Sequence, residues 1–296
     1  MSGSTDGGSS YSDIMEYLTI SAVGNAQDFG GEVTQAAWFG SAASDGVRGT
    51  MMGGGQNPTL SRYNNIAYFR FLSFTDARDF GDLSQARIGH NSACDGNRVV
   101  SAGGHTGAYA STKVDTMDYY DMSTFMNALD FGEITAVRSS IGTAVSDGTR
   151  GFWAGGATIN PSTTTYTNTI DFVTIRQPSG PAREFGDLVR AQGASHSVTD
   201  GVRAVMACGW NSSTNYGDMD VYSLTTQNDA TYFAELTQER RDSSSASNGI
   251  RGIWMGGFTT GVEDTIDYAN IGIESNAKDF GILGGNRNGG ASCSGA

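Results

Sequence analysis

Apolar residues in this chain occur in short runs that are separated by polar, glycine-containing turns. A turn of the type Ser-Asp-Gly-Val-Arg-Gly occupies residues 44–49 and recurs in related form at 94–99, 146–151, 199–204 and 247–252. Asp-Gly or Asn-Gly between two apolar runs is a strong signal of a β-hairpin, because both residues tolerate the positive φ angles of a type I′ turn. The pattern therefore predicts an all-β chain built from many hairpins.

Each turn belongs to a longer repeat. An apolar strand that ends in small residues follows the turn, and then come a variable polar loop, a strand with an acidic-aromatic pair and a last strand with a phenylalanine. These phenylalanines recur every 47 to 54 residues, at Phe29, Phe80, Phe131, Phe185, Phe233 and Phe280. Four antiparallel strands in a unit of this length are typical of a β-propeller blade, whereas solenoid repeats are shorter.

The two ends of the chain carry nearly the same text. Residues 15–30 read MEYLTISAVGNAQDFG, and residues 265–281 read TIDYANIGIESNAKDFG. Five full units cover 31–81, 82–132, 133–186, 187–234 and 235–281. Because residues 1–30 hold three expected strands and residues 282–296 hold one, we expect the two remnants to form a sixth blade together. The prediction is a single six-bladed propeller over residues 1–296, with four antiparallel strands per blade and the sixth blade shared by the two termini.

A pair of glycines ends the second strand of most units, as at 53–54, 103–104, 155–156 and 256–257, and Cys208 replaces the first of them in one unit. Blades converge toward the propeller axis, where a residue without Cβ lets two backbones approach closely. We expect this pair to be a packing feature.

Two stretches resemble known families. Residues 86–104, ARIGHNSACDGNRVVSAGG, resemble the kelch repeat, with phenylalanine in place of its usual tryptophan on the last strand. The string at 265–281, together with GDLSQAR at 81–87, resembles a recurrent pattern in propellers of marine bacteriophages, especially those of cyanobacteria. The first resemblance implies a kelch-type propeller. The second implies a structural protein of the virion that is made in the host cytoplasm and present in multiple copies.

Charge and hydropathy restrict the partners. The chain has 31 acidic and 18 basic side chains and a net charge of −13, which argues against binding to nucleic acid. No apolar run approaches the roughly 20 residues that cross a bilayer, so we expect no membrane insertion. The polar N-terminus, MSGSTDGGSS, has neither the basic nor the apolar region of a secretory signal peptide.

Few residues indicate metal, redox or kinase chemistry. The cysteines are Cys94, Cys208 and Cys293. They are far apart and odd in number, so we expect small buried residues without a disulfide framework. The histidines are His90, His105 and His196. They lack metal-ligand spacing, so we predict neither a metal site nor a cofactor. The Asp-Phe-Gly motif recurs at the blade period without the other kinase motifs, which indicates packing.

An arginine stands three residues after the Asp or Asn of every hairpin turn: Arg48, Arg98, Arg150, Arg203 and Arg251. In a propeller these arginines would form a ring on one face. We expect each guanidinium to pair with a carboxylate or carbonyl of a neighbouring blade, because the chain has an excess of carboxylates. An anion site at the axis is the alternative.

Acidic residues recur on the third strand of the units, at Glu16, Asp118, Asp171, Asp220 and Asp267, whereas the first full unit has Ala67 there. Paired carboxylates could perform acid–base chemistry. Because the equivalent residues lie in different blades, we expect a hydrogen-bonding role within each blade instead.

The loops between the second and third strands vary most and are rich in Ser, Thr, Asn and Tyr. Variable loops on a rigid scaffold are where binding usually occurs, and Tyr and Trp offer broad contact area at a low entropic cost. The candidate binding residues are Tyr63, Tyr109, Tyr166, Trp210 and Tyr216. They could stack on a sugar ring or contact a protein.

These observations predict a non-catalytic virion protein on the tail, a fibre or the capsid surface. Its expected partners are other virion proteins and a glycan or protein of the host envelope, bound through a rigid disc. Two alternatives stay open. One is a carbohydrate-active or oxidase-type enzyme on the same fold, and the other is a cellular kelch adaptor.

Overall fold

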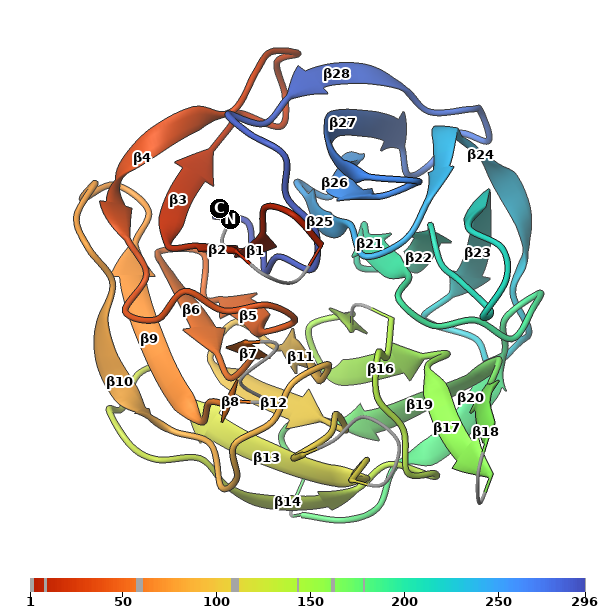
Figure 1. The fold of residues 1–296 in the computed structure, drawn as a ribbon. Helices are drawn as coiled ribbons and strands as arrows, with labels where there is room; N and C mark the ends of the chain where they lie inside the picture. The colour runs from red at the N-terminus through yellow and green to blue at the C-terminus, as the bar shows by residue number, and fades with distance from the viewer. Residues whose placement is uncertain are drawn as a thin grey trace.

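The computed structural model describes residues 3–7, 10–56, 61–107, 112–142, 144–160, 163–177 and 179–295. Over these residues the chain forms β-strands and turns without a helix, and thus has no helix that could cross a membrane. The sheets stand side by side in a ring about a central axis (Figure 1). The arrangement is a β-propeller, as the repeat predicts.

Five four-stranded antiparallel sheets follow one another around the ring, each with its first strand nearest the axis (Figure 1). The first blade consists of β5 (Ser41–Ser44), β6 (Arg48–Met52), β9 (Asn65–Arg70) and β10 (Arg78–Asp82). The second consists of β11 (Asn91–Cys94), β12 (Arg98–Ala102), β13 (Thr116–Asp121) and β14 (Leu129–Glu133). The third consists of β15 (Val145–Ser146), β16 (Arg150–Ala154), β19 (Thr169–Thr174) and β20 (Arg183–Asp187).

The fourth blade consists of β21 (His196–Thr199), β22 (Arg203–Ala207), β23 (Tyr216–Ser223) and β24 (Thr231–Arg240). The fifth consists of β25 (Ser244–Ser247), β26 (Arg251–Phe258), β27 (Val262–Asn270) and β28 (Lys278–Ile282). Two short hairpins extend the variable loops of the first and third blades. They are β7 (Gly55–Gln56) with β8 (Ser61–Arg62), and β17 (Ala157–Asn160) with β18 (Thr163–Tyr166).

The place between the fifth and first blades, which we call the sixth position, differs from the prediction. There β3 (Ile14–Tyr17) and β4 (Gln27–Glu32) form a two-stranded sheet. β1 (Gly3–Ser4) and β2 (Tyr11–Ser12) pair separately near the axis, and residues 283–295 contain no strand. The prediction of a sixth four-stranded blade is therefore wrong. In each full blade a second strand joins the innermost strand to the third, and nothing in the described chain supplies that strand here.

The two ends of the chain nevertheless meet, as the repeated text predicts. Ser4 and Asn288 exchange two backbone hydrogen bonds of 3.0 Å. At the rim, the Gly24 amide donates to the Phe280 carbonyl at 3.0 Å, and the Ala26 amide donates to the Ile282 carbonyl at 2.9 Å. The ring is thus closed by contacts between residues more than 250 positions apart.

An alanine that stands three residues before each repeated phenylalanine explains why this text recurs. The alanine amide, or its equivalent, donates to a carbonyl of the last strand of the preceding blade over 2.7 to 2.9 Å: Ala26, Ala77, Ala128, Ala182, Ala230 and Ala277. The preceding Asn or Asp side chain often accepts a second bond from the same strand, as Asn127 does from the Asp82 amide at 3.0 Å. The motif is therefore a clasp between neighbouring blades, and it occurs at both ends because the ring has to close there.

The core lies between the blades. The repeated phenylalanines are at most 5% exposed, which confirms that Asp-Phe-Gly is a packing motif. The double glycines lie closer to the axis, where Gly103 has a φ of 66° and the Gly104 amide donates to the Arg138 carbonyl of the next blade at 2.9 Å. A Cβ on Gly103 would lie 2.8 Å from that carbonyl oxygen, so close approach requires glycine. Cys208 adopts the same backbone conformation, with a φ of 64°.

Candidate functional site

The acidic residues of the third strands are buried beneath the surface. In the second blade, Asp118 accepts a hydrogen bond from Arg87 at 2.9 Å, and neither side chain is exposed to solvent. The Ser84 hydroxyl donates to the other carboxylate oxygen at 2.6 Å, and Arg87 also donates to the Ser101 carbonyl at 3.2 Å. One buried arginine thus links the entry loop, the second strand and the third strand of its own blade.

The same arrangement recurs in two further blades. Arg138 pairs with Asp171 at 2.7 Å in the third blade, and Arg240 pairs with Asp267 at 3.1 Å in the fifth, all with fully buried side chains. A threonine replaces Ser84 in both. Burial alone lowers the pKa of Arg87 and Arg138, and the paired aspartate opposes that shift. The prediction of a hydrogen-bonding role within each blade holds for these three aspartates, whose oxygens face the interior.

These buried arginines are the residues whose role the sequence reasoning missed. A signal for them exists within the chain itself, because every full blade with arginine at the position of Arg87 also has aspartate at the position of Asp118. The first blade has Ala37 and Ala67 at the two places, and both alanines are buried. Comparing the repeats position by position would therefore have indicated that the two positions are related, but not that the side chains touch.

The fourth blade keeps only half of the pair. Gln192 stands where the second, third and fifth blades have arginine, and Asp220 forms no ion pair within the described chain. The nearby Arg190 pairs with Asp218 instead. Burial raises the pKa of Asp220 to about 6, against the attraction of Arg190, so this carboxyl is the exception among the third-strand aspartates.

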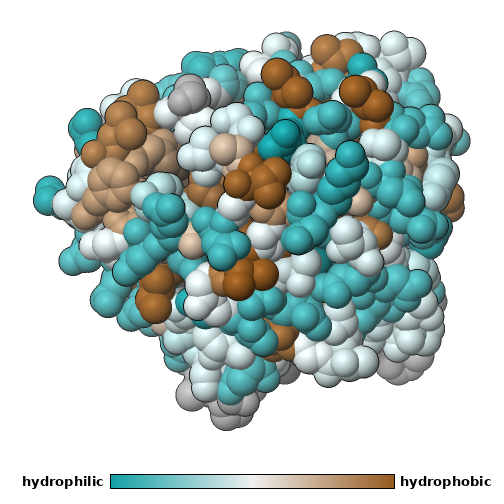
Figure 2. All heavy atoms as spheres, turned by 90° about the horizontal axis from the view of Figure 1, so that it is seen from above, coloured by the Kyte–Doolittle hydropathy of each residue, from teal (hydrophilic) through white to brown (hydrophobic). Residues whose placement is uncertain are grey.

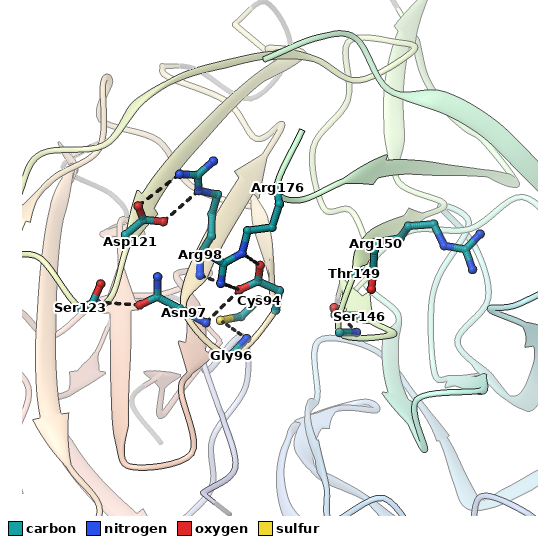
Figure 3. A network of polar contacts seen from close by, with 12 residues as sticks. Cys94, Gly96, Asn97, Arg98, Asp121, Ser123, Ser146, Thr149, Arg150 and Arg176 are labelled. Carbon is teal, nitrogen blue, oxygen red and sulfur yellow. Dashed lines mark hydrogen bonds and ion pairs between the residues drawn. The ribbon is translucent and has the colours of Figure 1, made fainter. Parts of the chain in front are cut away.

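The arginines of the hairpin turns mostly bind carboxylates of their own blade. Arg48 pairs with Asp45 at 2.7 Å, and the turns of the third and fourth blades repeat this contact three residues apart. Arg98 instead pairs with Asp121 on the third strand of its blade at 2.9 Å (Figure 3). The turn aspartate is simply the nearest acceptor, because a tight hairpin brings positions i and i+3 together.

Contacts between neighbouring blades, which the sequence led us to expect for all five turn arginines, are seen for only some of them. Arg251 donates to the Ile20 carbonyl at 3.0 Å, and Arg150 donates to the Leu224 carbonyl. A carboxylate of a neighbouring blade is reached by a different arginine, Arg176, which extends toward the turn of the second blade and pairs with Asp95 (Figure 3).

Three of the candidate binding residues cluster on the loops of the third and fourth blades. Tyr166 and Trp210 meet edge to face with ring centroids 6.0 Å apart. The Arg241 guanidinium lies over the Trp210 ring at 4.9 Å, and Arg190 lies over the Tyr216 ring at 4.7 Å. Stacking and cation–π contacts of this kind hold aromatic rings in fixed orientations. Tyr63 is half-buried in the first blade, and Tyr109 lies outside the described residues.

The histidines belong to the protein interior. Burial lowers the pKa of His196 to about 3 and that of His105 to about 4, and His90 is shifted well below its ordinary value. The His90 ring nitrogen Nδ1 lies 2.7 Å from the Ser101 hydroxyl. Within the part of the chain that the structure describes, no three His, Cys, Asp or Glu side chains are grouped so that they could hold a metal ion.

A groove of about 450 Å³ lies at the sixth position. Its borders are β3 on one side and residues 291–295 on the other, and its walls come from the first and fifth blades. The lining is largely apolar and includes Met51, Phe69 and Ile253. We call this cavity the sixth-position groove.

Exposed apolar side chains also gather near the groove. Figure 2 shows them at the left of the rim, which is the side of β4 and β10 in Figure 1. Tyr17 and Leu72 line the groove and are exposed, as is Phe74, whose ring contacts that of Tyr17 edge to face at 5.5 Å.

No protein-family model matches the chain, and a comparison with curated proteins finds no match either. The class of the protein is thus defined by its fold and contacts. It is an all-β propeller whose blades are held by outer clasps, inter-blade phenylalanines and buried arginine–aspartate pairs.

Proposed function

We propose that this propeller is a non-catalytic binding module and a structural component of a phage particle, on the tail, a fibre or the capsid surface. The observation that carries the non-catalytic part is the burial of Asp118, Asp171 and Asp267 in ion pairs with arginine. An acid–base mechanism would need its carboxylates at a surface, whereas these three bind arginine in the interior of their blades.

Two features support binding as the activity. The clasps and the closed ring make a rigid support, and the variable loops place Tyr166, Trp210 and Tyr216 in fixed contacts on it. Pre-oriented aromatic rings bind proteins and sugars with little loss of side-chain entropy. The resemblance of residues 265–281 to phage propellers supports other virion proteins, or a glycan or protein of the host envelope, as the partners.

The kelch-type, six-bladed form belongs to this proposal as well. We assign the sixth position to a blade that becomes complete in the assembled particle. The bond from the Ala26 amide to the Ile282 carbonyl already joins that position to the fifth blade, and the bond from the Ala77 amide to the Glu32 carbonyl joins it to the first.

Mass spectrometry of particles purified on a density gradient tests the location. We expect peptides of this chain at a constant ratio to the capsid protein in several preparations, and immunogold labelling should then locate it on the particle. Absence from purified particles that contain the other structural proteins would overturn the proposal.

A glycan array tests the loop face independently. If Trp210 and Tyr166 bind a host glycan, Trp210→Ala should abolish retention on the array, whereas a substitution on the far turn face, Val202→Ser, should leave it unchanged. Turnover of any retained glycan would contradict the non-catalytic assignment.

A further inference from the structure

The sixth-position groove has the surroundings of one missing β-strand. In the second blade, β13 pairs with β12 on one side and with β14 on the other. At the sixth position, β3 occupies the place of β13, and among the described residues it pairs with β4 alone. The edge of β3 that faces the groove therefore has backbone groups without a strand partner. Such an edge is a template for another strand.

The inner border of the groove lies where an innermost strand would be. The Ser244 hydroxyl donates to the Gly290 carbonyl, and the Ser292 hydroxyl donates to the Ser245 carbonyl, both at 2.8 Å. These bonds fix residues 290–292 against β25, much as Ser245 fixes β25 against the fourth blade by donating to the Ser197 carbonyl at 2.8 Å. The strand that is absent is thus the second one, between residues 290–295 and β3.

One wall of the groove shows what the absent strand would cover. Phe69 and Phe71 of the first blade are half-buried. Their equivalents in the other four blades are at most 6% exposed: Tyr120, Val173, Tyr222 and Ala269 for Phe69, and Met122, Ile175, Leu224 and Ile271 for Phe71. In those blades the second strand of the preceding blade covers the side chains, as Thr50 covers Tyr120, with 2.7 Å between the two hydroxyl oxygens.

The opposite wall is equally apolar. Ile253 and Met255 of β26 point from the fifth blade toward the sixth position, where they pack with Leu18 and Ile20. A strand in the groove would therefore have apolar or small side chains on both of its faces. All five second strands meet this requirement, with the sequences RGTMM, RVVSA, RGFWA, RAVMA and RGIWM.

We propose that the sixth-position groove binds an extended strand donated by another polypeptide of the assembly. That strand begins with arginine, continues with four apolar or small residues and runs antiparallel to β3. With this strand in place, the walls from the first and fifth blades would be covered in the same way as the walls between the other blades. A basic first residue also complements a chain of net charge −13. The arginine of the strand would also find an acceptor. The Arg150 and Arg251 side chains donate to the carbonyls of Leu224 and Ile20 in the next blade, and Phe71 has the equivalent position in the first blade.

This inference rests on the proposed binding function, since it names the partner, but it can fail separately. Backbone pairing along a free edge supplies the affinity in such complexes, and alternate side chains in pockets supply the specificity. Five strand residues span about 17 Å, so the interface is short and depends on apolar burial on both faces.

The probe is a synthetic peptide of residues 95–104, DGNRVVSAGG, which contains one of the chain's own second strands. We expect it to bind the full 296-residue chain and to raise its melting temperature in a concentration-dependent way. The same peptide with Val100→Pro should bind at least ~10-fold more weakly, because proline has no amide hydrogen and cannot join a central strand. Equal binding of both peptides would overturn the proposal, as would binding of neither.

The register can be tested by a disulfide crosslink. Ala93 pairs with Val100 in the second blade, and Cys293 lies at the position equivalent to Ala93. The peptide variant Val100→Cys, activated as a mixed disulfide, should therefore crosslink to Cys293, whereas Val99→Cys should react at a rate at least ~10-fold lower because its side chain points to the other face. Crosslinking that is the same for both peptides, or that persists in Cys293→Ser protein, would contradict the assigned register.

Two further measurements separate the other occupants. Phe71→Ser should weaken peptide binding at least ~10-fold by removing an apolar wall, with Val202→Ser as the exposed control. If the free chain sediments as a dimer and the peptide dissociates it, the occupant is a second copy and the proposal of a different polypeptide is wrong. If the peptide does not bind but the protein is present in purified particles, this inference is wrong and the proposed function still stands.

Discussion

The first and second blades solve the same packing problem in two ways. The second blade buries Arg87 and Asp118 as a hydrogen-bonded ion pair, and the first blade buries Ala37 and Ala67 at the two equivalent places. Both blades keep four strands and the same clasps to their neighbours. The comparison teaches that the pair is dispensable when both members change together, because replacing both leaves no uncompensated buried charge, whereas removing one of them does.

The fourth blade is an intermediate between these two solutions. Gln192 removes the positive charge, but Asp220 remains buried, with its pKa raised to about 6. We infer that this blade carries a local instability that the other two avoid. The predictions below test this comparison.

The largest effect is expected for Arg138→Ala in the third blade. The substitution leaves Asp171 buried without its guanidinium and should lower the free energy of unfolding by about 3–5 kcal/mol. The double variant Arg138→Ala with Asp171→Ala imitates the first blade and should recover a large part of that loss. Urea denaturation of both variants measures the coupling, and additive losses would show that the two residues do not act as a pair.

A smaller effect with the opposite sign is expected for Asp220→Asn. The raised pKa of Asp220 means that its contribution favours the folded state below about pH 4 and is lost as the pH rises through about 6. Asparagine removes that loss, so the variant should be more stable than the parent by about 3 kcal/mol at pH 8 and nearly equal to it at pH 4. Thermal unfolding across this pH range checks the sign. Asp118→Asn is the matched control and should destabilise the chain at pH 8, because its ion pair with Arg87 is lost.

The aromatic loop cluster should contribute less to stability than to binding. Trp210→Ala removes the edge-to-face contact with Tyr166 and the stacked Arg241, which should lower the free energy of unfolding by about 1–2 kcal/mol. Trp210→Phe retains a ring and should retain most of that stability. A loss larger than that of Arg138→Ala would mean that the loops, rather than the buried pairs, dominate the stability of the ring.

The smallest effect is expected for Arg176→Gln. Arg176 pairs with Asp95 of the neighbouring blade, but its side chain is largely exposed (Figure 3). Exposed ion pairs are screened by water and salt and are offset by side-chain entropy. We expect no measurable shift of the urea midpoint at physiological salt. A clear, salt-dependent decrease of the urea midpoint would contradict this expectation. It would show that exposed ion pairs between neighbouring blades contribute to the stability of the ring.

The sequence by itself determined the features that depend on local geometry and on repetition. Asp-Gly turns located the hairpins, the spacing of the phenylalanines located the blades, and the matching text at 15–30 and 265–281 showed that the ends meet. These predictions depend only on the φ preference of turn residues and on the length and text of the repeat. None of them requires knowledge of which side chains touch.

Only the tertiary structure decided the pairings across distance. Arg138 and Asp171 are 33 positions apart, and the sequence offers other carboxylates closer to that arginine. Tyr166 and Trp210 belong to different blades and meet because the blades stand side by side. The sixth position shows the same limit, since strand-like text at both ends does not make a blade without a second strand between them. A sheet exists only where each strand finds a hydrogen-bonding neighbour, and the whole ring decides where those neighbours lie.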